Sequence, residues 1–296
     1  MSNPEVQGTE LGKAPDGSSR SDASIVTQFF LLPLAVVAGL VGIFLLFTMA
    51  TRKSPNARDY LQTLRTGRFN QRWQAAFELS NLLKKEDIAH KDPTLVRELV
   101  KAFEECTENR EEDPRIKRYL ALALGDSRSK EAIAPLQKAA RTTDPDTRLC
   151  ALWGLAQLEA IDSKEIFLGC LADPDSAVRS VCAFGLGKSG KSGLEHLAPL
   201  LNDPVPEVRW NAALSLARNG DGAGQAILME MLDRKYLDGF SGLDASEKAN
   251  LILNAMRGLK GLNPSGLESK MKNLAETDPD PAVRKAAKSW LSSGPS

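Results

Sequence analysis

Few residues of this chain have the type and spacing that enzyme chemistry requires. The candidates for metal binding or nucleophilic attack are Cys106, Cys150, Cys170, Cys182, His90 and His196. No two cysteines form a CxxC pair, and two histidines so far apart cannot build a His-rich metal site. No Gly-rich phosphate loop and no GxSxG motif occurs. We therefore expect no cofactor, no metal site and no catalytic residue, in a protein that is not an enzyme.

The cysteines are predicted to be structural. Three of the four fall inside apolar runs of helical pattern, where a free thiol behaves as a small apolar side chain. We expect buried thiols, which is the usage of a reducing compartment. The alternative is a redox-sensitive thiol, which requires a partly exposed, electropositive setting.

The charge of the chain excludes one class of partner. Its 38 Lys and Arg residues balance its 38 Asp and Glu residues, so there is no excess positive charge to follow a phosphate backbone. Apolar residues make up 42% of the chain, which is enough to form a core without disulfide or metal support. We expect no nucleic acid partner.

One apolar stretch near the beginning of the chain predicts a membrane anchor. Residues 23–51 carry no charge, and residues 25–49 are rich in Leu, Ile, Val and Phe. A helix of that length is longer than the ~30 Å hydrocarbon core of a bilayer. The stretch is longer than the apolar part of a signal peptide, which is the alternative. We predict a retained single-pass transmembrane helix over residues 25–49.

The residues around this stretch set its predicted orientation. Lys and Arg are more frequent after the stretch than before it, which places the large C-terminal part in the cytoplasm and the protein in the cell inner membrane. Residues 1–24 are predicted to form a disordered tail and residues 50–56 a linker. Small residues four apart, such as Ala35 and Gly39, suggest a homodimer through the transmembrane helix.

The rest of the chain contains several copies of one short sequence motif, and we call each copy a phrase. When the phrases are aligned on one position, called zero, the zeros are Arg72, Lys117, Arg148, Arg179, Arg209, Ile252 and Arg284. Position +7 is then leucine in all seven phrases, and position +3 is small in six. These positions share one face of a helix, and the middle spacings of about 30 residues equal one pair of helices. We predict an all-α superhelical solenoid of about seven helix pairs over residues 57–292, with one continuous core.

The start of each phrase carries a helix signal. Asp-Pro opens several phrases, as at Asp144, Asp173, Asp203 and Asp278. We expect Asp to cap the helix and Pro to occupy its first turn. A second apolar helix lies between successive phrases, and Gly or Asn clusters end the preceding helix.

The pattern Asp-Pro-x-x-x-Val-Arg, followed by a small-residue helix and then Gly, resembles HEAT-like repeats. The type is the short one found in phycobilisome lyase subunits and many bacterial proteins. The resemblance covers most of the chain after residue 57, with two departures. The sixth zero is Ile252 and follows an insertion around residues 233–247, and a long acidic loop near residues 104–113 separates the first two phrases. The sequence assigns no role to the insertion.

Two sets of residues are predicted to have defined roles. The basic zeros Arg148, Arg179, Arg209 and Arg284 are expected to form a structural ladder with acidic residues of neighbouring repeats, as the resemblance implies. Position +5, which holds Phe77, Leu122, Trp153, Phe184 and Leu214, is expected to belong to the core. The partner-binding face is predicted to contain Gln74, Tyr119, Cys150, Val181, Trp210 and Asn211.

These expectations lead to one main functional hypothesis and one alternative. The main hypothesis is a membrane-anchored scaffold or adaptor, whose helical-repeat surface binds a protein partner in the cytoplasm. The alternative, which the resemblance implies, is an accessory chaperone or lyase-type subunit acting on a chromophore-bearing protein.

Overall fold

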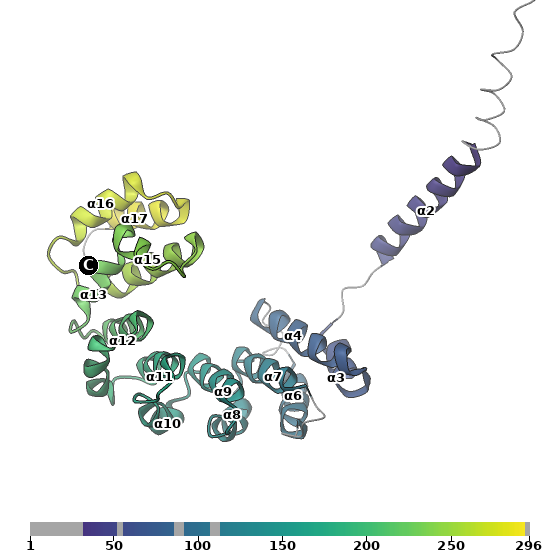
Figure 1. Ribbon diagram of the computed structural model, residues 1–296, viewed down its shortest axis with the longest axis horizontal. Coiled ribbons are helices and arrows are strands. Elements are labelled where there is room, and N and C mark those ends of the chain that lie inside the picture. Colours follow the sequence, from purple (N-terminus) through teal and green to yellow (C-terminus); the bar gives the residue numbers. More distant parts are fainter. Residues whose placement is uncertain (1–31, 52–55, 86–91, 107–112, 294–296) are drawn as a thin grey trace, which may run out of the picture. The chain divides into compact units, whose positions relative to one another are not determined.

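The computed structural model describes residues 32–51, 56–85, 92–106 and 113–293, all of which are helices and their connections (Figure 1). The chain divides into two units, residues 1–55 and residues 56–296. The predicted tail over residues 1–24 and most of the predicted linker lie outside the described residues.

The first unit contains one described helix, α2, which spans Leu32–Thr51. It starts seven residues after the predicted start and has Pro33 in its first turn. Its last four residues are Thr48, Met49, Ala50 and Thr51. A membrane crossing requires a long helix of predominantly apolar residues. Nowhere in the described ranges does a helix combine the necessary length and apolar character.

The prediction of a transmembrane helix over residues 25–49 is therefore wrong, because α2 covers only residues 32–49 of that stretch and no described helix meets the requirements of a membrane span. The predicted location, in the inner membrane with the repeats in the cytoplasm, depended on the same span and is wrong for the same reason. The predicted homodimer through this helix has no support.

The second unit consists of helix pairs in succession, as the repeat pattern predicts. The first five pairs are α3 (Ala57–Thr66) with α4 (Phe69–Lys85), α6 (Pro93–Glu105) with α7 (Pro114–Asp126), η2 and α8 (Lys130–Ala139) with α9 (Pro145–Gln157), η3 and α10 (Ile161–Gly169) with α11 (Ser176–Lys188), and η4 (Leu194–Asn202) with α12 (Pro206–Arg218). The last two are α13 (Gln225–Met231) and α14 (Arg234–Asp238) with α15 (Ala245–Leu259), and α16 (Leu267–Thr277) with α17 (Pro281–Ser293).

The positions that are alike in all phrases are the positions that are buried in the structure. Six of the seven leucines at position +7 are at most 1% exposed, and the seventh, Leu291, is half-buried. All seven residues at position +3 are buried. The second helices of successive pairs, from α4 through α7, α9 and α11 to α12, pack directly against one another, which small residues at position +3 permit.

The core consists of two clusters that meet at α12, where one continuous core was predicted. One face of this helix, with Val208, Ala212 and Leu216, belongs to the first cluster. The face with Trp210, Ala213 and Ala217 belongs to the second cluster. Each second helix lies between two neighbours, so its apolar residues must occupy both sides.

The Asp-Pro pairs have two different structural roles. Asp144 caps α9 by accepting from the backbone N–H of Thr147, and Pro145 is the first helical residue, as predicted. In the phrase that starts at Asp173, however, α11 begins two residues later and Asp175 is its cap. The first Asp of this longer phrase is thereby available for another contact.

That contact is with the basic residue of the preceding repeat. The Arg148 guanidinium lies 3.1 Å from the Asp173 carboxylate, and Arg179 donates two hydrogen bonds of 2.8 and 3.0 Å to Asp203. Arg209 and Arg284 instead donate to backbone carbonyls of their own Asp-Pro loops, at 2.6 to 3.1 Å. Arg148 and Arg179 therefore contact the opening Asp of the next phrase, whereas Arg209 and Arg284 contact backbone oxygens of their own phrase.

The insertion before the sixth phrase supplies the arginine that position zero of that phrase lacks. Ile252 occupies the zero position of that phrase and is fully buried, so it cannot form an ion pair. Arg234, in the inserted helix α14, donates two hydrogen bonds of 2.8 Å to the buried Asp278 carboxylate of the seventh phrase. The insertion thus places an arginine on the opening Asp of the next repeat from outside the common register.

The rung between Arg179 and Asp203 predicts a pH-dependent contribution to stability. Hydrogen bonds from Arg179 hold the pKa of the Asp203 carboxyl below its ordinary value, although burial opposes this. Since the folded pKa is lowered, the contribution is complete above the unfolded pKa of about 3.9 and is lost as the pH falls through the folded pKa. Asp203→Asn should cost about 2 kcal/mol at pH 7, and the difference from the wild type should narrow at pH 3, as measured by urea unfolding.

An exposed ion pair is the matched control for this experiment. Glu268 and Lys272 lie 2.7 Å apart on the surface of α16, so Glu268→Gln should cost no more than about 0.5 kcal/mol at either pH. A loss for Asp203→Asn that stays the same at pH 3 and pH 7 would contradict the assignment.

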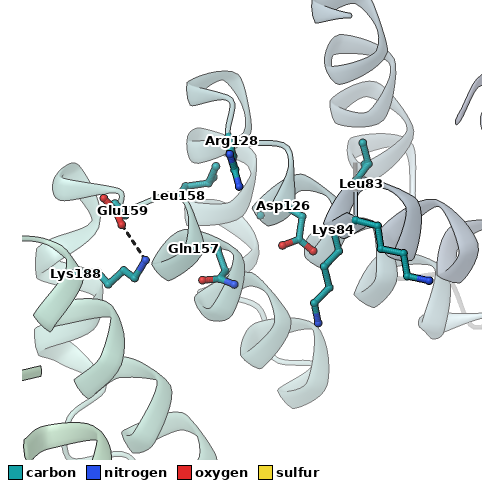
Figure 2. A pocket seen from close by; sticks show the side chains of 10 residues that line it. Leu83, Lys84, Asp126, Arg128, Gln157, Leu158, Glu159 and Lys188 are labelled. Atoms are coloured by element: carbon teal, nitrogen blue, oxygen red, sulfur yellow. Dashed lines mark hydrogen bonds and ion pairs between the residues drawn. The ribbon is translucent and has the colours of Figure 1, made fainter. Parts of the chain in front are cut away.

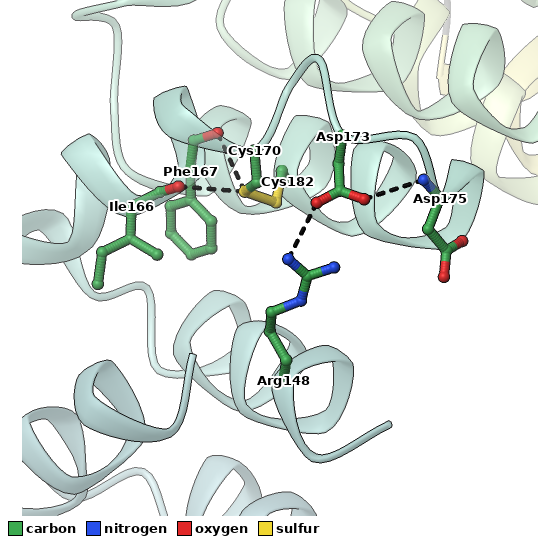
Figure 3. The surroundings of a disulfide bond; sticks show 7 residues. All are labelled: Arg148, Ile166, Phe167, Cys170, Asp173, Asp175 and Cys182. Carbon is green, nitrogen blue, oxygen red and sulfur yellow. Dashed lines mark hydrogen bonds and ion pairs between the residues drawn. A yellow bond between two sulfur atoms is a disulfide. The ribbon is translucent and has the colours of Figure 1, made fainter. Parts of the chain in front are cut away.

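Two cysteines form a disulfide, which the sequence analysis did not predict. Cys170, just after α10, is bonded to Cys182 in α11, with a Cα–Cα distance of 6.1 Å (Figure 3). The sulfur of Cys170 also lies 3.1 Å from the Ile166 carbonyl oxygen. Cys106 and Cys150 are not part of a disulfide. The prediction of buried free thiols is therefore wrong for the bonded pair, because the helix packing within one repeat brings the two residues together.

Candidate functional site

The second helices present a continuous row of side chains on one face. Positions +2 and +5 are three residues apart and so share a helix face. Position +5 was predicted to belong to the core, but Phe77 is 39% exposed and Trp153 is 41% exposed, while the other three members of the row are half-buried. The prediction is wrong because no further layer of described helices covers this face.

The middle of this face is hollowed into a cavity of about 570 Å³, which we call the aromatic groove. It is lined mainly by apolar side chains, and it has a size typical of small-molecule sites. Its lining residues come from α7, α9, α11 and the start of α12: Leu122, Leu149, Cys150, Trp153, Ser176, Ala177, Ser180, Val181, Phe184, Val205, Glu207 and Asn211.

A stacked pair of rings lines the aromatic groove. The Trp153 and Phe184 rings have a centroid distance of 5.3 Å and an interplanar angle of 17°. Both residues stand at position +5, in α9 and α11, so the packing of these two helices sets the stack. Arg218 lies over the Phe184 ring at 5.3 Å, and the Lys188 ammonium at 5.7 Å. The groove therefore combines a flat apolar surface with cations at its edge.

The structure brings together three of the six predicted partner-face residues. Cys150, Val181 and Asn211 all line the aromatic groove. The Asn211 amide donates a hydrogen bond of 2.7 Å to Ser180, which fixes its orientation. These three residues occupy position +2 of successive repeats, so the packing of the second helices brings them side by side.

The other three residues lie elsewhere. Gln74 is exposed on α4, and Tyr119 on α7 packs edge-on against Phe77 with ring centroids 5.2 Å apart. Both are on the same helix face as the groove but outside its lining. Trp210 is only 2% exposed and its indole N–H donates to the Tyr236 hydroxyl at 3.3 Å. It packs in the second core cluster, because position +1 faces the next helix pair.

The free thiol in the groove is a poor nucleophile. Burial raises the pKa of Cys150 to about 11, although the nearby Arg118 opposes this shift. Only the thiolate reacts readily, and at neutral pH this thiol is protonated. Its surroundings suit noncovalent contact with a ligand. Among the described residues, no cluster of three or more His, Cys, Asp or Glu side chains could hold a metal ion.

The sequence contained a signal for the groove residues that the repeat alignment alone did not use. Leu122, Trp153 and Phe184 are large and apolar at a position whose helix face also carries polar residues at +2, such as Asn211. Such a mixture is typical of a half-exposed binding surface. Lys188 is four residues after Phe184 in the same helix, but Arg218 could not be found in this way, because it reaches the ring from another repeat.

Comparison with known proteins agrees with this fold. Residues 96–187 and 165–238 match the sequence profile of HEAT repeats. The complex of CpcE and CpcF of phycocyanin lyase from Nostoc sp. PCC7120 has a similar structure, with a TM-score of 0.60 and 18% sequence identity over 81% of this chain and 88% of the other. At that identity the likeness concerns the fold.

A curated relative is similar in sequence over a shorter region. The bilin biosynthesis protein MpeU from Synechococcus sp. (strain WH8020) is 36% identical over 119 residues. The match spans 38% of this chain and 38% of the length of that protein. The expectation that the protein is not an enzyme is contradicted by the similarity to MpeU, which is named as a bilin biosynthesis protein. Residues 96–238 thus match HEAT repeats, and part of the chain is similar in sequence to a bilin biosynthesis protein.

Proposed function

We propose that the chain is a subunit of a bilin lyase-type enzyme and that its aromatic groove binds a linear tetrapyrrole. The observation that carries this proposal is the stacked pair of Trp153 and Phe184 in an apolar cavity of about 570 Å³. A bilin is a flat, conjugated and largely apolar molecule, and aromatic side chains bind such molecules by offset stacking. The sequence relative that is named for bilin biosynthesis supports the same ligand class.

The residues of the groove fit this ligand in charge as well as in shape. Apolar side chains from three helices form its walls, and cations lie at its edge beside Phe184. A tetrapyrrole with acidic side chains has the complementary distribution. The protonated Cys150 thiol favours noncovalent holding of the bilin, so this subunit would present the pigment for attachment to a second protein.

A protein partner is part of this proposal. The structural relative is a complex of two chains, CpcE and CpcF, and a helical-repeat array suits an extended protein interface. We propose that this chain likewise acts with a second subunit. The predicted partner residues Gln74 and Tyr119 lie on the same helix face, beyond the groove, and are candidates for that contact.

Bilin binding should depend on Trp153. Titration of the purified chain with biliverdin, followed by the change in visible absorbance, should give saturable binding. Trp153→Ala removes one ring of the stack and should weaken binding by about 2 kcal/mol, or close to 30-fold.

Phe77 provides a matched control. It occupies the same repeat position, is similarly exposed at 39% and lies outside the groove. Phe77→Ala should therefore leave biliverdin binding unchanged. Failure of the wild type to bind, or an equal loss from both variants, would refute the assignment of the groove.

A further inference from the structure

A second cavity adjoins the repeat face at the C-terminal ends of the second helices. This cavity, which we call the charged cavity, has a volume of about 560 Å³ and is enclosed by α4, α7, α9 and α11 (Figure 2). Its ionisable lining residues are Lys84, Lys85, Asp126, Arg128, Glu159 and Lys188. Four basic side chains thus face two acidic ones, and the cavity carries a net positive charge.

Two residues of the charged cavity have an unfavourable backbone conformation. Arg128 and Glu159 have φ values of 54° and 50°, in the left-handed region. Both stand at position +11 of their repeats, where later repeats have Gly190, Gly220 and Asn263 at positive φ. Glycine avoids the cost of about 1 kcal/mol or more that other residues bear there. Among the described residues with positive φ at this position, only Arg128 and Glu159 have long side chains, and both line the charged cavity.

The internal contacts explain only one of these two side chains. Glu159 accepts a hydrogen bond of 2.8 Å from Lys188. Arg128 has only a through-space interaction with Asp126, and with the residues that the structure describes it forms no ion pair or side-chain hydrogen bond. In Figure 2 its side chain is drawn with those of Asp126 and Lys84 around the cavity. Arg128 is exposed, so its guanidinium is accessible to a ligand in the charged cavity.

The charged cavity and the aromatic groove are neighbours on the same helices. In α7, α9 and α11, the groove residue is followed four positions later by a residue of the charged cavity: Leu122 by Asp126, Trp153 by Gln157, and Phe184 by Lys188. Residues four apart share a helix face and are about 6 Å apart along the axis. The Lys188 ammonium lies 5.7 Å from the centre of the Phe184 ring. One elongated ligand can therefore contact both cavities.

We propose that the charged cavity binds the carboxylates of the molecule whose ring system stacks in the aromatic groove, with Arg128 and Lys188 as the residues that select for an acidic ligand. This inference rests on the proposed function, since a bilin supplies both the conjugated rings and propionate side chains. Arginine binds carboxylates through paired hydrogen bonds, and lysine contributes a positive charge beside the ring stack. Binding would thus discriminate acidic bilins from neutral analogues.

The experiment compares biliverdin with its dimethyl ester, which keeps the rings and removes the charges. The wild type should bind the acid about tenfold more tightly than the ester. Arg128→Gly should abolish this preference by weakening the acid alone. The variant should also melt at a higher temperature than the wild type, because glycine relieves the left-handed strain, so loss of binding cannot be due to unfolding.

Asn263→Gly is the matched control, because it relieves strain at the same repeat position far from the cavities in sequence. It should raise the melting temperature and leave both affinities unchanged. Equal binding of acid and ester by the wild type would overturn the inference and leave the proposed function intact, whereas no binding of either would refute the proposed function itself. A glutamate-rich peptide should not displace biliverdin; displacement would assign the cavity to an acidic protein segment instead.

Discussion

Replacement of Gly125 by alanine is expected to destabilise the repeat unit by about 3 kcal/mol, near the upper end for overpacking. Gly125 in α7 is buried against Gly154 in α9, and an added Cβ would lie 2.5 Å from the Gly154 Cα and 3.2 Å from its carbonyl oxygen. These neighbours are backbone atoms, so no side chain can rotate away. The two helices must separate, and urea unfolding monitored by circular dichroism would measure the loss.

The Gly125→Ala substitution should also change the shape of the aromatic groove. Leu122 and Trp153, which line the aromatic groove, lie on these same two helices, so their separation should widen the groove and weaken biliverdin binding. Gly169→Ala in α10 is the matched control, because its Cβ would meet nothing within 4 Å. That variant should be unchanged or up to about 1 kcal/mol more stable. Similar stability of the two variants would contradict the close approach of α7 and α9.

Removal of the disulfide should have an effect of similar size. Cys170 and Cys182 are separated by 12 residues in sequence, and a loop of that length predicts a stabilisation of about 3 kcal/mol through restriction of the unfolded chain. The double variant Cys170→Ala/Cys182→Ala should lose this amount in urea unfolding. Alanine is the residue at the position of Cys182 in most other repeats, so the substitution should pack without strain.

Reductant provides the control for the disulfide prediction. It should destabilise the wild type to the level of the double variant and leave the double variant unchanged. A thiol titration of the denatured, unreduced wild type should detect only Cys106 and Cys150. Four reactive thiols in that titration would show that the bond does not form in the protein.

Several features of the fold could be predicted from the sequence because they depend on local periodicity. Each repeat has leucine at position +7, and most have a small residue at position +3, which predicts a helix with one buried face. The spacing of about 30 residues predicts stacked pairs of helices. The structure has these residues buried. The transmembrane helix predicted over residues 25–49 is not among these features, because the described helix starts at Leu32 and no described helix is long and apolar enough to cross a membrane.

The candidate site could be predicted only in part. Three position +2 residues, Cys150, Val181 and Asn211, were placed on the binding face and do line the groove. Trp153 and Phe184 were assigned to the core, because a large apolar residue on a sandwiched helix is usually buried. Whether such a residue is covered depends on the presence of another layer, which the sequence of one helix does not contain.

The sequence by itself determined that this chain forms stacked helix pairs and which face of each pair is buried, because burial of a helix face imposes a period of 3.6 residues that can be read along the chain. Only the tertiary structure decided the contacts between repeats. Arg234 meets Asp278 across 44 positions, Arg218 reaches Phe184 from the next repeat, and Cys170 meets Cys182. These contacts depend on the angles at which neighbouring helices pack, and no local pattern specifies those angles.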